Sequence, residues 1–231
     1  MQEQFKQSLS TINIHLSDNQ LQQLARYADF LSEQNKVMNL TAIDTVDEIY
    51  EKHFYDCAMI SQFIQANQSV CDVGSGAGFP GVVLAIVRPD IHVVLLEPLQ
   101  KRCRFLNDLI ARLALKNCKV DNRRAEDSAD LREKFDVVTA RAVANLRILA
   151  ELCLPLAKVD GHFIAMKGSK GLIELQEAHH ALSMLNAQLV QVDETKLYSQ
   201  DDVRINLVIR KNKKTSLKYP RGYSQIKKKP L

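Results

Sequence analysis

The sequence is poor in several residue types, and each shortage excludes a class of protein. It has no tryptophan, its five cysteines form no C-x-x-C pair, and no apolar run approaches the ~20 residues needed to span a bilayer. The N-terminus lacks a basic start followed by an apolar stretch, so it does not resemble a secretory signal. We therefore expect a cytoplasmic protein with reduced thiols, no membrane contact and no metal site.

Acidic residues are absent from the C-terminal end of the chain. Between Arg210 and Leu231 there are nine Lys or Arg and no Asp or Glu, whereas the rest of the chain has 22 basic and 27 acidic residues. Two tyrosines and two prolines lie among these cations, a mixture that suits attraction to phosphate and stacking on bases. A solvated basic surface is the alternative. We predict nucleic-acid contacts from Lys211, Lys213, Lys214 and Arg221.

The order of apolar patterns predicts an α/β protein with an N-terminal helical extension. Residues 17–36 and 45–64 have helical spacing, and strands alternate with helices from Ser69 onward. Continuous apolar strands separated by helices indicate a parallel sheet covered on both faces, and two final strands without a helix between them indicate an antiparallel hairpin. The predicted divisions are a helical cap (1–66), a main domain (67–210) and a basic tail (211–231). The predicted strands cover 69–73, 92–97, 118–122, 135–140, 161–167, 187–199 and 203–211, with helices near 80–88, 100–115, 125–132, 142–156 and 170–185.

Glycine is scarce, yet four of the eight glycines lie in "VCDVGSGAGFPG", residues 70–81. The run follows a strand and precedes a helix, which is where ligands bind in a doubly wound sheet. Counted from Gly76 it matches the dinucleotide pattern G-x-G-x-x-G, but Asp72 would repel a pyrophosphate there. A ligand with an amino group and no phosphate suits that carboxylate. This favours S-adenosylmethionine over NAD.

The ends of the next strands supply further candidate contacts. Glu97 follows the second strand at the distance from the glycines that suits hydrogen bonds to ribose hydroxyls, and it is also placed to cap the next helix. Ala125 and Glu126 follow the third strand, at the level expected for adenine. Together with Asp72, the predicted cofactor contacts from strand geometry and the glycine loop are Gly74, Gly76, Gly78, Glu97, Ala125 and Glu126.

The motifs of base-amine and pyrimidine-C5 methyltransferases are missing. The fourth strand is followed by "RAVANL", without the Asn/Asp-Pro-Pro-aromatic loop, and Cys153 lies in an apolar helix pattern rather than beside proline. An acceptor nitrogen with a free lone pair needs only positioning, so we assign no catalytic residue. Arg141 and Lys167, at the ends of the fourth and fifth strands, are predicted to face the acceptor and to bind phosphate or guanine O6.

The chain resembles the bacterial 16S ribosomal RNA guanine-N7 methyltransferases, formerly called glucose-inhibited division protein B. The resemblance is carried by "DVGSGAGFPG", "LLEPLQKRCRFL", "VTARAVANL", "AMKG", "MNLTAI", "KYPR" and the pair His53 and Asp56 in "KHFYDC". It implies a class I S-adenosylmethionine-dependent methyltransferase fold, Rossmann-like, with seven mostly parallel strands.

The same resemblance implies methylation of N7 of one guanine in the small ribosomal subunit, or in its assembly intermediate, by a monomeric enzyme. Its cofactor contacts carry over to Gly74, Phe79, Ala125, Glu126 and Arg141. It gives no role to His53 and Asp56. The alternatives are a methyltransferase for another RNA nucleotide and an NAD-dependent oxidoreductase.

Overall fold

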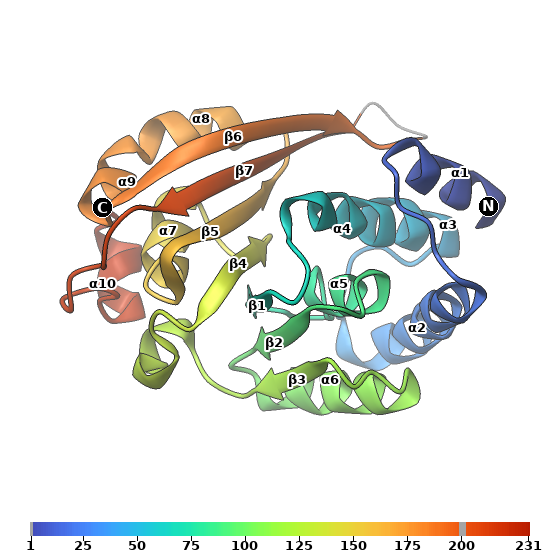
Figure 1. Ribbon diagram of the computed structural model, residues 1–231. Helices are drawn as coiled ribbons and strands as arrows, with labels where there is room; N and C mark the ends of the chain where they lie inside the picture. Colours follow the sequence, from blue (N-terminus) through green and yellow to red (C-terminus); the bar gives the residue numbers. More distant parts are fainter. Residues whose placement is uncertain (1, 199–201) are drawn as a thin grey trace.

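The computed structural model describes residues 2–198 and 202–231, and within them seven strands form one mixed sheet (Figure 1). The spatial order is β3-β2-β1-β4-β5-β7-β6. The first five strands along the chain pair in parallel, and β7 pairs antiparallel with both β5 and β6. The predicted parallel sheet with a C-terminal antiparallel hairpin is thus confirmed. The strands are β1 (Ser69–Val73), β2 (His92–Leu96), β3 (Cys118–Asp121), β4 (Phe135–Arg141), β5 (Ala157–Lys167), β6 (Ala187–Lys196) and β7 (Val203–Lys211).

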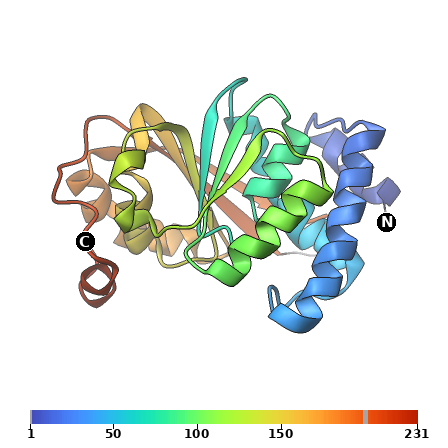
Figure 2. The same cartoon turned by 90° about the horizontal axis from the view of Figure 1, so that it is seen from below.

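Helices cover both faces of the sheet, because its side chains alternate between two hydrophobic clusters. Val70 of β1 packs in the first cluster and Cys71 in the second, and Val137 and Val138 of β4 divide in the same way. The first cluster includes α2 (Asp18–Met38), α5 (Gly81–Val87) and α6 (Gln100–Arg112). The second includes α7 (Leu146–Cys153), α8 (Gly171–Glu177), α9 (His179–Met184) and α10 (Tyr223–Lys228). Figure 2 shows the sheet between these two groups.

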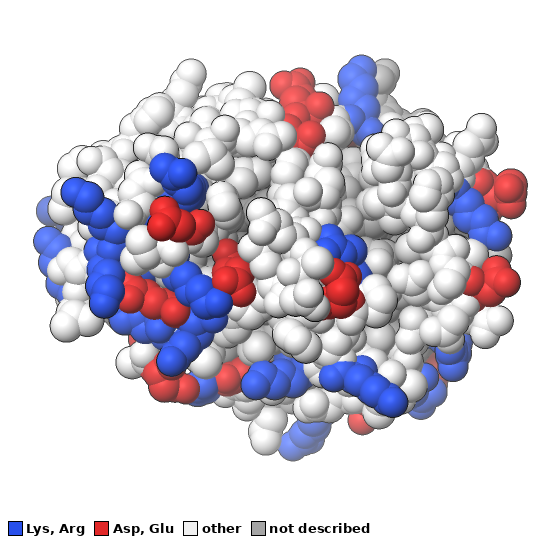
Figure 3. Space-filling model, viewed as in Figure 1, with Lys and Arg blue, Asp and Glu red and all other residues white. Residues whose placement is uncertain are grey.

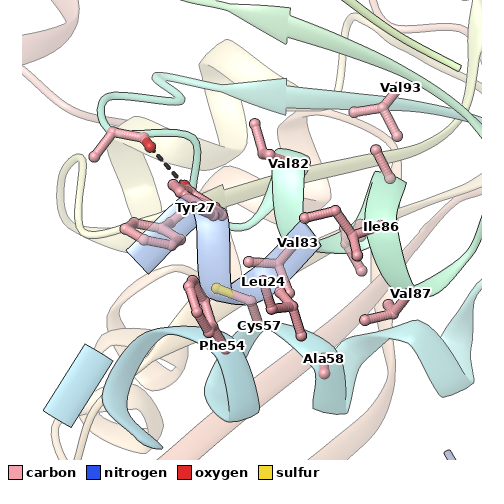
Figure 4. Packing of buried hydrophobic residues seen from close by; sticks show 14 of the residues in the cluster. Leu24, Tyr27, Phe54, Cys57, Ala58, Val82, Val83, Ile86, Val87 and Val93 are labelled. Carbon is pink, nitrogen blue, oxygen red and sulfur yellow. Dashed lines mark hydrogen bonds between the residues drawn. The ribbon is translucent and has the colours of Figure 1, made fainter. Parts of the chain in front are cut away.

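The N-terminal helices pack on α5 and complete the first cluster (Figure 4). Ser17 starts α2 with a capping box to Gln20, and Asn39 ends it in a left-handed conformation at φ +50°. After α2 the chain forms α3 (Val46–Glu48), a π-helical stretch (Ile49–Tyr55), α4 (Asp56–Met59) and a 3₁₀ turn (Ile60–Phe63). Both predicted N-terminal helical regions are therefore present. A first helix, α1 (Gln2–Thr11), was not predicted.

The C-terminal segment, defined here as residues 212–231, folds back on the main domain. Tyr219 and Ile226 are buried in the second cluster. The side chain of Arg221 donates twice to the buried carboxylate of Glu151, at 2.8 and 2.6 Å, and its backbone N–H donates to the same group at 2.9 Å. Arg132 donates to the carbonyl oxygens of Thr215, Ser216 and Tyr219, and Arg147 donates to those of Pro230 and Leu231. The basic end of the chain is thus a packed element.

Several elements differ from the predicted boundaries. Residues 125–132 form two 3₁₀ turns instead of a helix, and Ser128 between them donates to the carbonyl of Arg124. The helix predicted from 142 starts only at Leu146, because Asn145 caps it and leaves 142–145 as a loop. The stretch 170–185 is divided at Ala178 into α8 and α9. β6 ends at Lys196, and Ser199 of the predicted strand lies outside the described residues.

Candidate cofactor and acceptor cavities

The glycine run forms a loop whose conformation requires glycine at three positions. Gly74, Gly76 and Gly78 have φ values of +74°, +57° and +101°. A Cβ atom on Gly78 would lie 2.7 Å from the hydroxyl of Tyr27, and one on Gly81 would lie 2.3 Å from Leu95. Tyr27 also donates to the carbonyl of Ala77 at 2.6 Å, so α2 supports this loop from behind.

A cavity of about 470 Å³ lies above the carboxyl ends of β1, β2 and β4. Seven of the predicted cofactor residues line it: Gly74, Gly76, Phe79, Glu97, Ala125, Glu126 and Arg141. Gly78 does not line it but lies under Tyr27. This cavity is named the first cavity below.

Asp72 does not line the first cavity, which corrects the expectation that its carboxylate faces the ligand. The side chain is fully buried, and Oδ2 accepts a hydrogen bond from the backbone N–H of Gly81 at 2.9 Å. Oδ1 is buried without a hydrogen-bond partner among the described residues. Burial raises the pKa of Asp72 to about 7, although the Gly81 N–H opposes this shift. The residue therefore lies beneath the loop, where it anchors the start of α5.

Glu97 lies in the first cavity and fixes the two loops around it. Its Oε2 accepts from the N–H of Gly76 at 2.9 Å, and its Oε1 accepts from the N–H of Leu99 at 2.9 Å. Only 1 % of the residue is exposed. This geometry is compatible with both predicted roles of Glu97, the helix cap and the ribose contact. The hydrogen bond to Leu99, which directly precedes α6, fits the cap, and the ribose contact stays a prediction.

His53, which had no assigned role, lies at one end of the first cavity between Phe79 and Arg141. The imidazole is 4.2 Å from the Phe79 ring centroid, and the Arg141 guanidinium is 4.8 Å from the same ring. Arg141 Nη2 lies 3.0 Å from His53 Nδ1, and Thr41 Oγ1 lies 2.9 Å from Nε2. Nδ1 also lies 3.1 Å from the carbonyl oxygen of Lys52, which only accepts, whereas a guanidinium only donates, so these two contacts of Nδ1 favour opposite tautomers of the ring.

The same surroundings hold His53 in its neutral form. Burial, and then the positive charge of Arg141, lowers the pKa of His53 to about 3. Both ring nitrogens are engaged, Nδ1 by Arg141 and the Lys52 carbonyl, and Nε2 by Thr41. His53 is therefore unsuited to accept a proton from a substrate near neutral pH.

A second cavity of about 540 Å³ adjoins the first and shares four lining residues with it: His53, Arg141, Ala142 and Val143. Lys167, predicted to face the acceptor, lines this second cavity. Its Nζ donates to the carbonyl of Ala144 and to Glu174 Oε2, both at 2.7 Å. The loop 142–145 and the end of β4 therefore separate two spaces, and Arg141 reaches both.

Asp56 joins Arg141 to a second arginine in this second cavity. Its Oδ2 lies 3.0 Å from Arg141 Nη1, and its Oδ1 lies 3.4 Å from Arg204 Nε. Burial raises the pKa of Asp56, and the two arginines oppose that rise. Arg204 and Glu174 also line the second cavity, and the sequence patterns gave no signal for either.

The predicted C-terminal contacts divide into buried and exposed residues. Lys211 is fully buried, with Nζ 3.1 Å from Glu133 Oε1 and 2.8 Å from the Ala157 carbonyl, so it is not available to nucleic acid. Arg221 is committed to Glu151. The prediction for Lys211 is corrected, whereas the contact of Arg221 with nucleic acid stays a prediction, since 24 % of its side chain is exposed. Lys213 and Lys214 are exposed, and their contact with nucleic acid stays a prediction.

Tyr223 lies in the first cavity although it was not among the predicted cofactor residues. This half-buried side chain from α10 lines the first cavity with Ala125 and Glu126, and the Arg124 guanidinium lies 5.9 Å from its ring centroid. An element at the end of the chain thus forms part of the wall where the adenine contacts were predicted. The sequence pattern suggested base stacking for the tyrosines of this stretch and gave no sign that one of them would reach the first cavity.

Comparison with known proteins places this geometry in a family. The model of rRNA small subunit methyltransferase G matches residues 20–203. The chain belongs to the rRNA small subunit methyltransferase G family. A member from Lactobacillus helveticus is 42 % identical over 99 % of this chain and 98 % of its own length, and one from Macrococcus caseolyticus is 44 % identical over 98 % and 97 %.

Solved structures show the methyltransferase fold outside this family. M. jannaschii TYW2 in complex with AdoMet has a TM-score of 0.57 and 16 % identity, covering 69 % of this chain and 76 % of that one. The ribosomal protein L11 methylase from Lactobacillus delbrueckii subsp. bulgaricus has a TM-score of 0.54 and 17 % identity, covering 70 % and 79 %. The class I methyltransferase fold predicted from the sequence is confirmed. Within the described residues no helix combines the length and apolarity needed to cross a bilayer.

Proposed function

We propose that this chain transfers the methyl group of S-adenosylmethionine to N7 of a guanine in 16S ribosomal RNA. The observation that carries the proposal is the pair of adjoining cavities in a member of this family, one with the predicted cofactor residues and one with basic side chains. They meet at His53 and Arg141, where a donor and an acceptor would be in contact. The substrate is the small ribosomal subunit or its assembly intermediate, and the enzyme works as a monomer in the cytoplasm.

The first cavity fits the cofactor in size and chemistry. Its volume is in the range of small-molecule sites, and glycines let the loop backbone approach a ligand closely. Glu97, Ala125 and Glu126 line this cavity, where Glu97 would bind the ribose and the other two would contact adenine. S-adenosylmethionine supplies an electrophilic methyl group on a sulfonium. Phe79 and Arg141 would close the end of the cavity nearest the acceptor.

The acceptor nitrogen must bring its own lone pair, because the described residues at the meeting point include no suitable base. His53 is held neutral with both nitrogens engaged, and Asp56 is paired with two arginines. Guanine N7 carries no proton and needs none removed. Its lone pair forms the new bond to the methyl carbon as the carbon–sulfur bond breaks, and the positive charge passes to the guanine ring. Positioning is then the main contribution of the protein.

The two alternatives have weaker support. A base amine would need a proton acceptor, which the meeting point lacks, so another RNA nucleotide is less favoured unless it offers a free ring nitrogen. An oxidoreductase is not supported by the family to which the chain belongs. Asp72 no longer argues against NAD, since it does not face the cavity.

Incubation with labelled cofactor and small ribosomal subunits from a strain that lacks this methylation tests the proposal. We expect one labelled guanine at N7, and mapping of the label to another position or atom would contradict the proposal. Calorimetry should also detect binding of S-adenosylmethionine, with a Kd from about 1 to 50 µM.

Arg141→Lys should lower kcat/KM by about 10- to 100-fold, because a lysine keeps the charge beside Asp56 but not the planar fork that reaches both cavities. The measurement is steady-state methylation of the same subunits, with thermal unfolding to check the fold. Arg104→Lys, at an exposed position of α6, is the control and should behave like the wild type. Equal activity of the two variants would remove Arg141 from the site.

A further inference from the structure

The second cavity carries more charge than a passage to the cofactor requires. Its lining includes four cations and two carboxylates: Lys52, Arg141, Lys167, Arg204, Asp56 and Glu174. Lys52 also pairs with Glu48 at 2.7 Å and Arg204 lies 3.9 Å from Asp202, so the lining combines cations and carboxylates and suits a ligand that offers both hydrogen-bond acceptors and donors. A nucleotide removed from its stack meets both conditions, and enzymes that modify a base commonly extrude it into such a pocket.

The shared wall fixes which edge of a guanine would face the cofactor. Transfer to N7 requires the N7 lone pair to point toward the first cavity, and O6 lies on the same edge of the base. Arg141 lines both cavities, so its guanidinium is at this edge. Adenine has an amino group in place of O6 and would present a donor to the arginine instead of an acceptor.

The opposite edge of guanine carries N1–H and the N2 amino group, which are donors and need an acceptor. Glu174 lines the second cavity and not the first. Its Oε2 accepts from the N–H of Leu146 and from Lys167, both at 2.7 Å, while Oε1 has no hydrogen-bond partner among the described residues. One carboxylate oxygen is therefore fixed in orientation, and the other is left for a ligand.

Asp56 is a less suitable acceptor than Glu174. Its Oδ1 accepts no hydrogen bond among the described residues, but an arginine lies on each of its two oxygens, and the residue is 3 % exposed. Its geometry suits a positioning role, since it aligns Arg141 with Arg204 along the cavity. Glu174 is more exposed, with 22 % of its side chain accessible.

We propose that the second cavity binds the acceptor guanine nucleotide, with Arg141 donating to O6 and Glu174 Oε1 accepting from N1–H and the N2 amino group. This inference rests on the proposed function. A carboxylate at that edge also favours the reaction, because methylation at N7 places positive charge on the ring and makes N1–H a stronger donor. Glu174 is thus a specificity residue that acts on kcat as well as on KM.

The first test is Glu174→Gln, which keeps an acceptor for the Leu146 N–H and removes the charge. We expect kcat/KM for small subunits to fall by at least tenfold, while the Kd for S-adenosylmethionine stays within twofold of wild type. Glu177→Gln is the matched control, because Glu177 is exposed on the same helix and lines neither cavity. Unchanged kcat/KM in Glu174→Gln would overturn the assignment.

The second test separates base recognition from a merely structural role. Subunits reconstituted with inosine at the target position lack only the N2 amino group of guanine. Wild-type enzyme should methylate them at least fivefold less efficiently, whereas Glu174→Gln should show almost no difference between the two substrates. If Glu174→Gln and inosine each lower kcat/KM by a factor of their own, and the two factors multiply when both changes are present, Glu174 does not contact this amino group. That result would overturn the proposal.

A binding measurement gives a readout that does not depend on turnover. With the first cavity saturated by S-adenosylhomocysteine, guanosine monophosphate should bind more tightly than inosine monophosphate, and Glu174→Gln should remove the preference. Equal binding of the two nucleotides by the wild type would contradict the inference. Failure of wild-type enzyme to methylate any subunit would instead contradict the proposed function, so the two failures are distinguishable.

Discussion

At the scale of single residues, Asp72 shows how one side chain can have a different role from the one its position suggests. Its place two residues before the first glycine predicted a carboxylate facing a cationic ligand. The structure turns it beneath the loop to the N–H of Gly81, and leaves Oδ1 without a partner. Successive side chains along β1 point to opposite faces of the sheet, and this alternation turns Asp72 to the face beneath the loop. The glycine motif does not reveal which face a given strand residue occupies.

The raised pKa of Asp72 predicts a pH dependence of stability. Because burial raises this pKa to about 7, the native state binds more protons than the unfolded state between about pH 4 and pH 7. The contribution of Asp72 to the free energy of unfolding is therefore fully present below the pKa of the unfolded state, and it is lost as the pH rises through 7. Asp72→Asn should remove this slope, making the variant more stable than wild type at pH 8 by up to about 4 kcal/mol.

Urea unfolding of wild type and Asp72→Asn at pH 5 and pH 8 measures the effect. The difference in unfolding free energy between the two proteins is the quantity of interest, since it cancels the contributions of other groups such as His53. Asp90→Asn is the control, because that carboxylate is half-buried and paired with Arg88 on the surface. A difference between wild type and Asp72→Asn that stays constant from pH 5 to pH 8 would contradict the prediction.

At the scale of elements, the sequence predicted the sheet better than the loops that form the site. Runs such as 69–73 and 203–211 are apolar enough to define strands, and the structure has β1 and β7 with those bounds. Residues 142–145 form a loop because Asn145 caps α7, and side-chain capping is hard to place within a helical pattern. This loop separates the two cavities.

Contacts between elements far apart in the sequence explain why the surroundings of two other residues were not predicted. Lys211 is buried because Glu133 and the Ala157 carbonyl receive its ammonium, and Tyr223 reaches the first cavity because α10 packs beside α7. Both depend on pairings across more than 50 residues. A charge pattern along the chain does not indicate such pairings. The assignment of cofactor residues at strand ends needed no such information, because parallel strands bring their carboxyl ends to one edge.

The C-terminal segment should therefore affect cofactor binding as well as RNA binding. Tyr223→Ala removes part of the wall of the first cavity, and we expect the Kd for S-adenosylmethionine to rise about 3- to 10-fold. Calorimetry measures this constant. Lys227→Ala is the matched control on α10, since its side chain is exposed and lines neither cavity. An unchanged Kd in Tyr223→Ala would show that the ring does not contact the bound cofactor.

At the scale of the whole molecule, charge and cavities are arranged around one end of the sheet. Lys and Arg side chains gather over the part of the surface where Figure 1 draws α10 and the C-terminus (Figure 3). The exposed lysines of the C-terminal segment are Lys213, Lys214, Lys218, Lys227, Lys228 and Lys229. Because α10 also lines the first cavity through Tyr223, the basic surface extends to the edge of the site. A phosphate backbone held there would lie beside the first cavity.

This arrangement predicts a salt dependence that the lysines of α10 control. Each phosphate contact adds about 0.7 to the slope of log K against log salt for single-stranded nucleic acid, through release of bound counterions. Replacing Lys227, Lys228 and Lys229 with Gln should lower that slope by up to about 2 for small-subunit binding. Affinity for S-adenosylmethionine should not change, because none of the three lines the first cavity.

Filter binding of labelled subunits from 50 to 300 mM salt gives the slope of log K against log salt for the wild type and for each variant. A second triple variant, with Gln in place of Lys36, Lys116 and Lys119, is a control of equal charge. These exposed lysines lie in α2, in the turn before β3 and in β3, respectively. The control should keep the wild-type slope. If both triple variants lose the same slope, the attraction comes from net charge alone and not from the C-terminal segment. A loss confined to the α10 variant means that RNA lies along α10, beside the wall that Tyr223 adds to the cofactor cavity.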